Sequence, residues 1–264
     1  MSGRYETMFS GLRARGDGAF GAFVMLGDPD LTTSARVLDA LAAGGADMIE
    51  VGIPFSDPIA DGPVIQAAAE RALRNGVTPP DCFRLLAGFR SRHPDLPVGI
   101  LIYANLVLAP GRSAFYRQAA EAGVDSVLVA DVPSLEAEAF AGAARSAKVH
   151  PVLIAAPNTP EPTLARIARL GGGYTYCVAR AGVTGADRAM ELDHGALFGA
   201  LARYAAPPPV LGFGISTPAQ VRQALAAGAA GVISGSGIVR LAETGDLAAV
   251  SSFVAEMKAA TRFK

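Results

Sequence analysis

The chain has 264 residues, of which 51% are hydrophobic and 18% charged, and its formal net charge is -1. This composition fits one large domain spanning residues 1–264, because α/β barrels of about 250 residues fold as single domains. The near-zero charge and the absence of any Lys/Arg block exclude a protein that holds nucleic acid or a membrane surface through a clustered positive field.

The cysteines and the N-terminus narrow the class further. Cys82 and Cys177 lie far apart and form no C-x-x-C pair, and the 3 histidines are scattered. This pattern predicts neither a disulfide framework nor a zinc site, and we expect no bound metal. The N-terminus lacks the apolar segment of a signal peptide, and no apolar run reaches the ~18 residues of a membrane span. We therefore expect a cytoplasmic protein.

The first predicted element is a short amphipathic helix. Tyr5, Phe9 and Leu12 share one helical face, and the helix is expected to end near Gly16 and to cover another part of the structure. A buried strand over 19–26 follows, closed by Gly-Asp-Pro.

The pattern of a helix end followed by an apolar strand then recurs along the chain. In three segments a helix stops at glycine and an apolar strand begins, over 45–52, 123–130 and 228–235. With the other apolar runs they predict eight strands: 19–26, 45–52, 98–103, 123–130, 149–155, 174–178, 210–214 and 228–235. Helical patterns fill the intervals at roughly 32–44, 79–91, 113–122, 134–146, 160–169, 192–204, 217–227 and 246–260. Eight alternations favour an α/β fold of the closed (β/α)8 TIM-barrel type, with an extra N-terminal helix and a short helix after strand eight, over an open doubly wound sheet.

One strand carries a charge in a core position. Glu50 stands where two sister strands carry Leu128 and Ile233, and a buried carboxylate is costly unless it is paired or neutral. Chemistry in this fold occurs at the C-terminal ends of the strands, so we interpret Glu50 as catalytic, with a structural glutamate bonded to nearby backbone as the alternative. Flanking Ile49 and Val51 are expected to favour the protonated form by excluding water.

The loop behind this strand carries a second acid. Asp61 lies in Asp-Gly-Pro, which is also ordinary helix-start chemistry, with Pro63 at the first helical position. Two acids delivered together can perform general acid–base catalysis if one is held protonated. The sequence offers no lysine at the barrel mouth for a Schiff base, no H-E-x-x-H and no G-x-S-x-G. Carboxylate chemistry on a small molecule remains.

Glycine-rich turns follow the last two predicted strands, at 212–216 and 235–237. Barrels commonly bind phosphate with the loops after strands seven and eight and the N-terminus of a short extra helix, so we expect backbone N–H groups there to hold a phosphate. A pair of plain tight turns is the alternative. The segment 180–187 after strand six is polar and glycine-hinged, and it suits a lid over a ligand as well as an ordinary surface loop.

Several segments together closely resemble the tryptophan synthase alpha subunit family. They are E-V-G-I-P-F-S-D-P-I-A-D-G-P at 50–63, Y-A-N at 103–105, A-D-V-P at 130–133, R-A-G-V-T-G at 180–185 and G-F-G-I at 212–215. The likeness covers essentially the whole chain. It implies a lyase that cleaves indole-3-glycerol phosphate to indole and glyceraldehyde 3-phosphate in tryptophan biosynthesis. The alternatives are a stand-alone indole-3-glycerol-phosphate lyase and a catalytically silent barrel that senses the phosphate ester.

The resemblance also implies roles for single residues. Glu50 would protonate the indole C3 carbon and take the glycerol hydroxyl proton, Asp61 would accept the indole N–H and bond to Thr184, and Tyr176 would lie beside Glu50. The substrate pocket is implied to comprise Phe23, Leu101, Leu128, Ala130, Ile154, Thr184, Phe213 and Ile233. The phosphate is implied to lie on Gly185, Gly214, Gly235 and Ser236.

A partner is implied as well. A tryptophan synthase beta subunit carrying pyridoxal phosphate would take the indole directly within an alpha2beta2 heterotetramer. It would contact Asp57, Pro58 and Asn105. No cofactor is expected in this chain itself. Gly237 and Ala181 stand where many relatives have alanine and serine, and neither change disturbs an implied chemical role.

Overall fold

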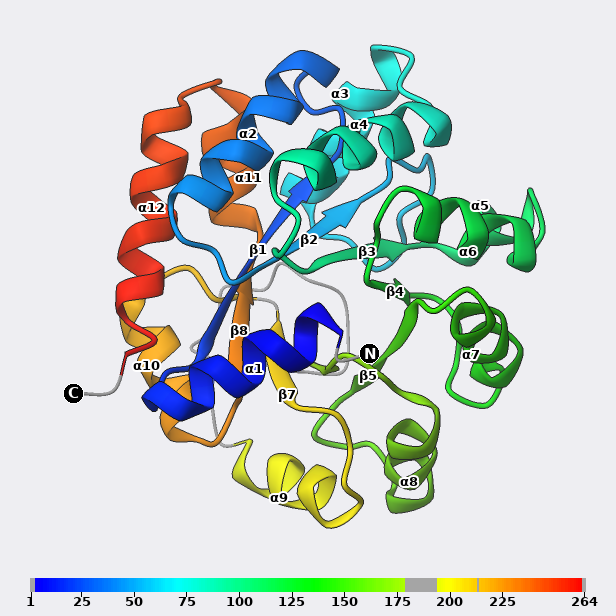
Figure 1. The fold of residues 1–264 in the computed structure, drawn as a ribbon, viewed down its shortest axis with the longest axis vertical. Helices are drawn as coiled ribbons and strands as arrows, with labels where there is room; N and C mark the ends of the chain where they lie inside the picture. Colours follow the sequence, from blue (N-terminus) through cyan, green and yellow to red (C-terminus); the bar gives the residue numbers. More distant parts are fainter. Residues whose placement is uncertain (1–2, 179–193, 213, 263–264) are drawn as a thin grey trace.

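Eight parallel strands close into a barrel in the computed structural model, which describes residues 3–178, 194–212 and 214–262 (Figure 1). Each strand pairs with the next along the chain, and the last pairs with the first. The strands are β1 (Ala19–Met25), β2 (Met48–Gly52), β3 (Val98–Ile102), β4 (Ser126–Val129), β5 (His150–Ala155), β6 (Thr175–Val178), β7 (Pro209–Gly212) and β8 (Gly231–Ser234). The predicted fold class and all eight predicted strands are confirmed.

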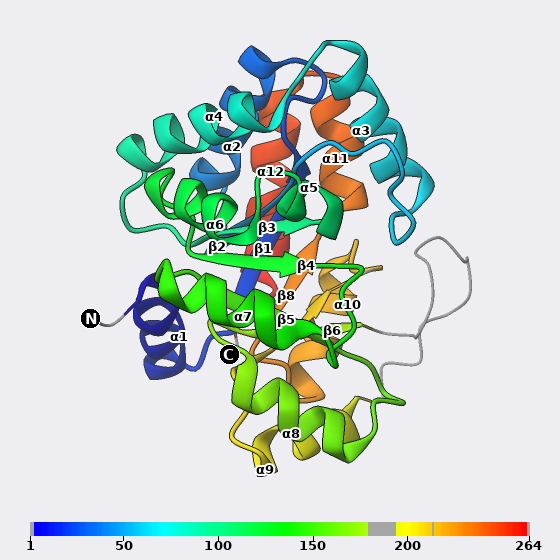
Figure 2. The same cartoon turned by 90° about the vertical axis from the view of Figure 1, so that its right-hand side faces the viewer.

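Helices surround the barrel on its outside (Figure 2). They are α1 (Arg4–Arg15), α2 (Leu31–Ala43), α3 (Pro63–Arg74), α4 (Pro79–Arg92), α5 (Ala104–Leu108), α6 (Arg112–Glu121), α7 (Ala137–Ser146), α8 (Glu161–Leu170), α9 (Gly195–Arg203), α10 (Pro218–Ala226), α11 (Ser236–Glu243) and α12 (Leu247–Ala259). The start of α3 at Pro63 and the short helix α11 agree with the sequence. Helix α5 was not predicted, because five residues are too few to show a helical period.

Helix α1 lies across the N-terminal mouth of the barrel (Figure 1). Its buried side chains Tyr5, Phe9 and Leu12 belong to the same apolar cluster as the barrel interior. The helix ends at Gly16, whose φ of 73° is left-handed and therefore suits glycine. The predicted covering role of the N-terminal helix is confirmed, and the opposite mouth is left for chemistry.

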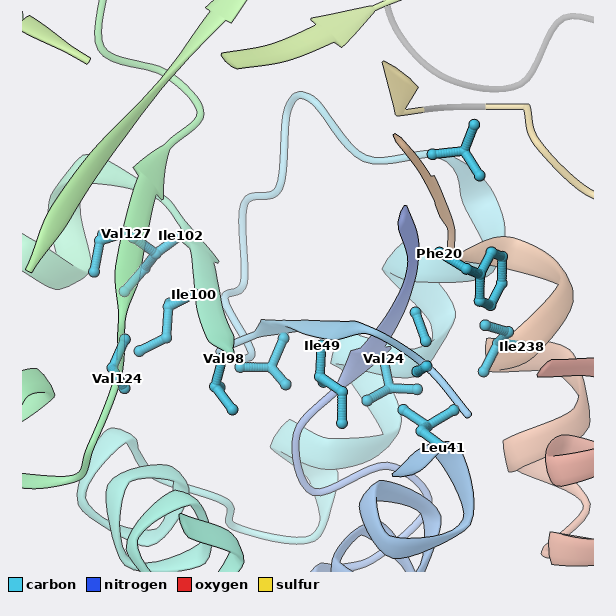
Figure 3. Close-up of a cluster of buried hydrophobic side chains, with 14 of the residues drawn as sticks. Phe20, Val24, Leu41, Ile49, Val98, Ile100, Ile102, Val124, Val127 and Ile238 are labelled. Atoms are coloured by element: carbon cyan, nitrogen blue, oxygen red, sulfur yellow. The ribbon is translucent and has the colours of Figure 1, made fainter. Parts of the chain in front are cut away.

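Alternate residues of each strand face two different apolar layers. The outer layer lies between the strands and the helices, and Figure 3 shows Val24, Ile49 and Val98 of three neighbouring strands in it. The inner layer fills the barrel and contains residues such as Phe23 and Leu101. Because the side chains of a strand alternate, the residue that follows Ile49 must point inward.

The described residues contain neither a membrane-spanning helix nor a reactive thiol. No helix within the described residues is long and apolar enough to cross a lipid bilayer. Cys82 and Cys177 are buried free thiols, and burial raises the pKa of each to about 12. Both thiols are therefore protonated at neutral pH and are inert as nucleophiles.

Candidate active site

Glu50 of β2 points into the barrel interior, two residues before the C-terminal end of the strand at Gly52. The residue is only 2% exposed, and the Tyr174 hydroxyl donates a hydrogen bond of 2.7 Å to its Oε1 atom. Its Oε2 atom is buried and has no hydrogen-bond partner among the described residues. One carboxyl oxygen is therefore anchored, and the other is available to a bound molecule.

The environment of Glu50 holds it close to its protonated form at neutral pH. Burial raises the pKa of this carboxyl to about 7, with a further upward contribution from the charge of Asp61, while the hydrogen bond from Tyr174 opposes the rise. The sequence attributed the exclusion of water from Glu50 to Ile49 and Val51, and this attribution was wrong. Both side chains belong to the outer layer, so the residues of the inner layer exclude the water. A carboxyl with a pKa near the working pH can both donate and accept a proton.

Behind Glu50 the barrel interior is polar in a small region. The Tyr5 hydroxyl and the Ser126 Oγ share a hydrogen bond of 2.9 Å, and the Tyr5 and Tyr174 ring centres are 5.4 Å apart. Gly99 pairs with Glu50 across the sheet, and a β-carbon there would lie 2.6 Å from the Ser126 Oγ. Only glycine leaves room for this group of hydroxyls beside the carboxyl.

Sequence reasoning missed Tyr174, although a signal existed. It precedes Tyr176 by two residues around β6, so the alternation of a strand places both rings inside the barrel. Tyr176 is 3% exposed, and burial raises the pKa of its hydroxyl, with further upward contributions from the charges of Glu50 and Asp61. A β-carbon at Gly212 would lie 2.2 Å from this ring, so glycine is required there.

The second acid, Asp61, stands in the loop between β2 and α3 and is 7% exposed. Burial raises its pKa to about 6, and a hydrogen bond with the Tyr103 hydroxyl acts in the opposite direction. Asp61 is therefore mainly ionised at neutral pH, whereas Glu50 is about half protonated. Two carboxyls whose environments separate their pKa values suit different acid–base roles.

The apolar residues that the sequence assigned to the pocket gather in the inner layer with these groups. Phe23, Leu101, Leu128 and Ile233 are buried there, and Ala130 and Ile154 are partly buried against them. The side chains come from β1, β3, β4, β5 and β8, except that of Ala130, which directly follows β4. Phe213 and Thr184 lie outside the described residues.

The candidate phosphate site lies where two turns meet. Helix α11 begins at Ser236, with Gly235 as its N-cap, and Gly214 follows β7 with a left-handed φ of 77°. The Ser234 hydroxyl donates a hydrogen bond of 2.7 Å to the Ile215 carbonyl, so the end of β8 is joined to the turn after β7. Free N–H groups at a helix start favour an anion. Gly185 lies outside the described residues.

Replacing Gly214 with aspartate is expected to raise the KM for a phosphate ester about 10-fold or more, because the new carboxylate would repel the phosphate dianion. The matched control is Gly214→Asn, which has the same shape and the same left-handed backbone demand without the charge. Steady-state kinetics of both variants isolates the charge. Equal KM values for the two would move the anion site elsewhere.

The residues assigned to a partner interface lie on the rim of the same mouth. Asp57 and Asn105 are exposed and Pro58 is half-buried, in the loop before α3 and in α5. Among the described residues, no group of three His, Cys, Asp or Glu side chains could hold a metal ion.

Comparison with known proteins gives one consistent result. The sequence pattern of the tryptophan synthase alpha chain family matches residues 9–262. The chain is 50% identical over 265 residues to the tryptophan synthase alpha chain of Photobacterium profundum, covering 98% of each chain. It is 52% identical over 265 residues to that of Klebsiella pneumoniae, again covering 98% of each.

Solved structures agree with the sequence relatives. Tryptophan synthase of Mycobacterium tuberculosis superposes with a TM-score of 0.90 at 31% identity, covering 100% of both chains. Tryptophan synthase subunit alpha of Legionella pneumophila superposes with a TM-score of 0.89 at 28% identity, covering 99% of both chains. The likeness therefore extends through the whole barrel, including the mouth that holds Glu50 and Asp61.

Proposed function

Because the chain belongs to the tryptophan synthase alpha chain family, we propose that Glu50 and Asp61 are the acid–base pair with which it works. The chain is a lyase that cleaves indole-3-glycerol phosphate to indole and glyceraldehyde 3-phosphate, a step of tryptophan biosynthesis. The observation that carries the proposal is the buried Glu50, which has one anchored oxygen and one free oxygen near the second carboxyl. Neither the silent-barrel nor the stand-alone alternative gains support from the comparisons.

The proposed reaction uses the two acids in sequence. Protonated Glu50 gives its proton to the indole C3 carbon, which breaks the aromaticity of the ring and leaves positive charge on its nitrogen. Ionised Asp61 accepts the indole N–H and stabilises that charge more than it stabilises the neutral substrate. The Glu50 carboxylate then removes the proton of the adjacent glycerol hydroxyl. The carbon–carbon bond breaks, its electrons restore the indole ring, and the hydroxyl carbon becomes an aldehyde.

The two ends of the substrate are proposed to bind to different parts of the site. An indole that buries ~150–250 Å² against the inner layer gains about 4–6 kcal/mol at roughly 25 cal/mol/Å². Phosphate bound at Gly214, Gly235 and Ser236 would fix the other end of the substrate, because helix-start N–H groups are directional. Tyr176, a buried ring of β6 in the inner layer, is proposed to keep the reacting carbon beside Glu50.

The two pKa values predict a bell-shaped pH dependence. Activity needs Asp61 ionised, so kcat/KM is expected to fall as pH drops through about 6. It also needs Glu50 protonated, so kcat/KM should fall as pH rises through about 7. Indole release from indole-3-glycerol phosphate, measured across this range, gives both limbs because kcat/KM reports the free enzyme. A flat profile would remove these two carboxyls from the reaction, and no indole release at any pH would contradict the function itself.

A beta subunit is proposed as the partner, with pyridoxal phosphate bound to it and not to this chain. Support comes from three exposed apolar side chains in the segments that follow the neighbouring strands β2, β3 and β4: Ile59 before α3 is 72% exposed, Leu108 at the end of α5 46%, and Leu135 before α7 72%. Exposed apolar side chains grouped on one rim are typical of an interface. Co-purification with a pyridoxal-phosphate protein in an alpha2beta2 assembly tests this proposal. Recovery of that assembly from the cytoplasmic fraction of the cell tests the predicted location.

A further inference from the structure

The loop that carries Asp61 is held by a residue of the neighbouring strand. Tyr103 directly follows β3 and is 3% exposed. Its hydroxyl accepts a hydrogen bond of 3.1 Å from the Ala60 backbone N–H. Its ring stacks on Phe55, with ring centres 5.3 Å apart and planes at 28°. Tyr103 therefore contacts the loop both near its start and next to Asp61.

The direction of the remaining hydrogen bond follows from this arrangement. A backbone N–H can only donate, so Ala60 uses an acceptor position of the Tyr103 oxygen. The single hydroxyl proton is then free to point to Asp61, the next residue along the loop, and a hydrogen bond from Tyr103 is what lowers the pKa of that carboxyl against the effect of burial. An ionised carboxylate can only accept, so the two donors and two acceptors match in one orientation.

We propose that Tyr103 is a positioning residue of the reaction: its hydroxyl, oriented by the Ala60 N–H, donates to Asp61 and holds that carboxylate in place, with its other oxygen left for the indole N–H. This inference rests on the proposed function of Asp61. Tyr103 does not touch the reacting atoms, and it acts only through Asp61.

The charges around Asp61 make this hydrogen bond consequential. Glu50 of β2 and Tyr176 of β6 face Asp61, and neither is a cation. Asp131, which accepts a hydrogen bond of 2.7 Å from the Ala104 N–H, adds a negative charge near Tyr103. In the described part of the chain, Asp61 forms no ion pair with a lysine or an arginine. A neutral donor such as Tyr103 is therefore what opposes the effect of burial on this carboxyl.

Tyr103→Phe tests the inference, because phenylalanine keeps the ring that stacks on Phe55 and removes only the hydroxyl. We expect the acidic limb of the kcat/KM profile for indole-3-glycerol phosphate to move up by about one pH unit, since hydrogen bonding to the ionised form lowers a pKa. The basic limb, set by Glu50, should stay within about 0.3 units of its wild-type position. At a pH well below the acidic limb kcat/KM should fall about 10-fold.

A matched control and a double variant separate positioning from structure. Tyr116→Phe removes a buried hydroxyl from α6, in the outer layer, and should leave both limbs unchanged. In an Asp61→Asn background the Tyr103→Phe change should cost less than about 2-fold, because the group it acts through is gone. An unshifted acidic limb in Tyr103→Phe, or an equal loss in both backgrounds, overturns the inference.

A second variant covers the case in which Tyr103→Phe fails to fold. A fluorinated tyrosine at position 103 keeps the shape and donates a stronger hydrogen bond, so the acidic limb should move to lower pH, opposite to the phenylalanine variant. A limb that moves up or stays in place contradicts the inference. Failure of the proposed role of Asp61 looks different, since Asp61→Asn alone would then retain wild-type activity, and failure of the lyase function would leave the wild type without indole release.

Discussion

Replacing Glu50 with glutamine is expected to lower the turnover of indole-3-glycerol phosphate by at least about 100-fold, because general acid–base catalysis typically contributes 10²–10⁴. The amide keeps the shape of the side chain, and its oxygen can still accept the Tyr174 hydrogen bond. It cannot give a proton to the indole ring or take one from the glycerol hydroxyl. The KM should change by less than about 3-fold, since the pocket and the phosphate site are intact.

The same substitution is expected to stabilise the protein at alkaline pH. The folded-state pKa of Glu50 is raised by burial to about 7 from its ordinary value of 4.5, so the folded protein binds more protons than the unfolded chain between these values. Stability is therefore full below about pH 4.5 and is lost as pH rises through about 7. Glutamine has no charge to bury, so Glu50→Gln should gain up to about 3 kcal/mol at pH 8, and little at pH 4.5.

Denaturant unfolding at these two pH values, together with single-turnover kinetics, measures both effects. The control is Glu256→Gln, an exposed position on α12, where the same chemical change should alter neither rate nor stability. A variant that is inactive but also less stable at pH 8 would indicate a structural glutamate, the alternative that the sequence left open. Turnover above a hundredth of wild type would remove Glu50 from the chemical step.

The barrel could be predicted because its repeating unit is local. A glycine that ends a helix, followed by an apolar strand, occurs at Gly45, Gly123 and Gly228, and each of these has a left-handed φ in the structure. The same comparison of sister strands singled out Glu50, since a carboxyl in an apolar register is visible from sequence alone. Both signals depend on residues that are neighbours in the chain.

Contacts across the barrel could not be predicted in this way. Tyr174 and Glu50 are 124 residues apart, and their hydrogen bond depends on strand order and side-chain rotamers together. The sequence placed Tyr103 within a motif. Its contact with the loop that carries Asp61 could not be predicted, because it depends on the register between β2 and β3. The implied contacts of Thr184 and Gly185 lie outside the described residues and stay predictions.

Asp61→Asn is expected to lower turnover by about 100-fold, close to the loss from removing one preorganised group in a charge-stabilising site. The asparagine oxygen can still accept the indole N–H, so the substrate should bind with a KM within about 3-fold of wild type. What the amide lacks is the negative charge that stabilises the indole cation after protonation. The loss should therefore appear in kcat rather than in KM.

The pH profile of Asp61→Asn gives a sharper test than its rate. The acidic limb near pH 6 should disappear, because the group that must be ionised is gone. The basic limb should move to lower pH, since the charge of Asp61 is one of the causes that raise the Glu50 pKa to about 7. Asp95→Asn, an exposed change before β3 at the opposite end of the barrel, should keep both limbs. If the acidic limb survives in Asp61→Asn, another group titrates there. The proposal that Asp61 acts as the ionised carboxyl and Glu50 as the protonated one would then be wrong.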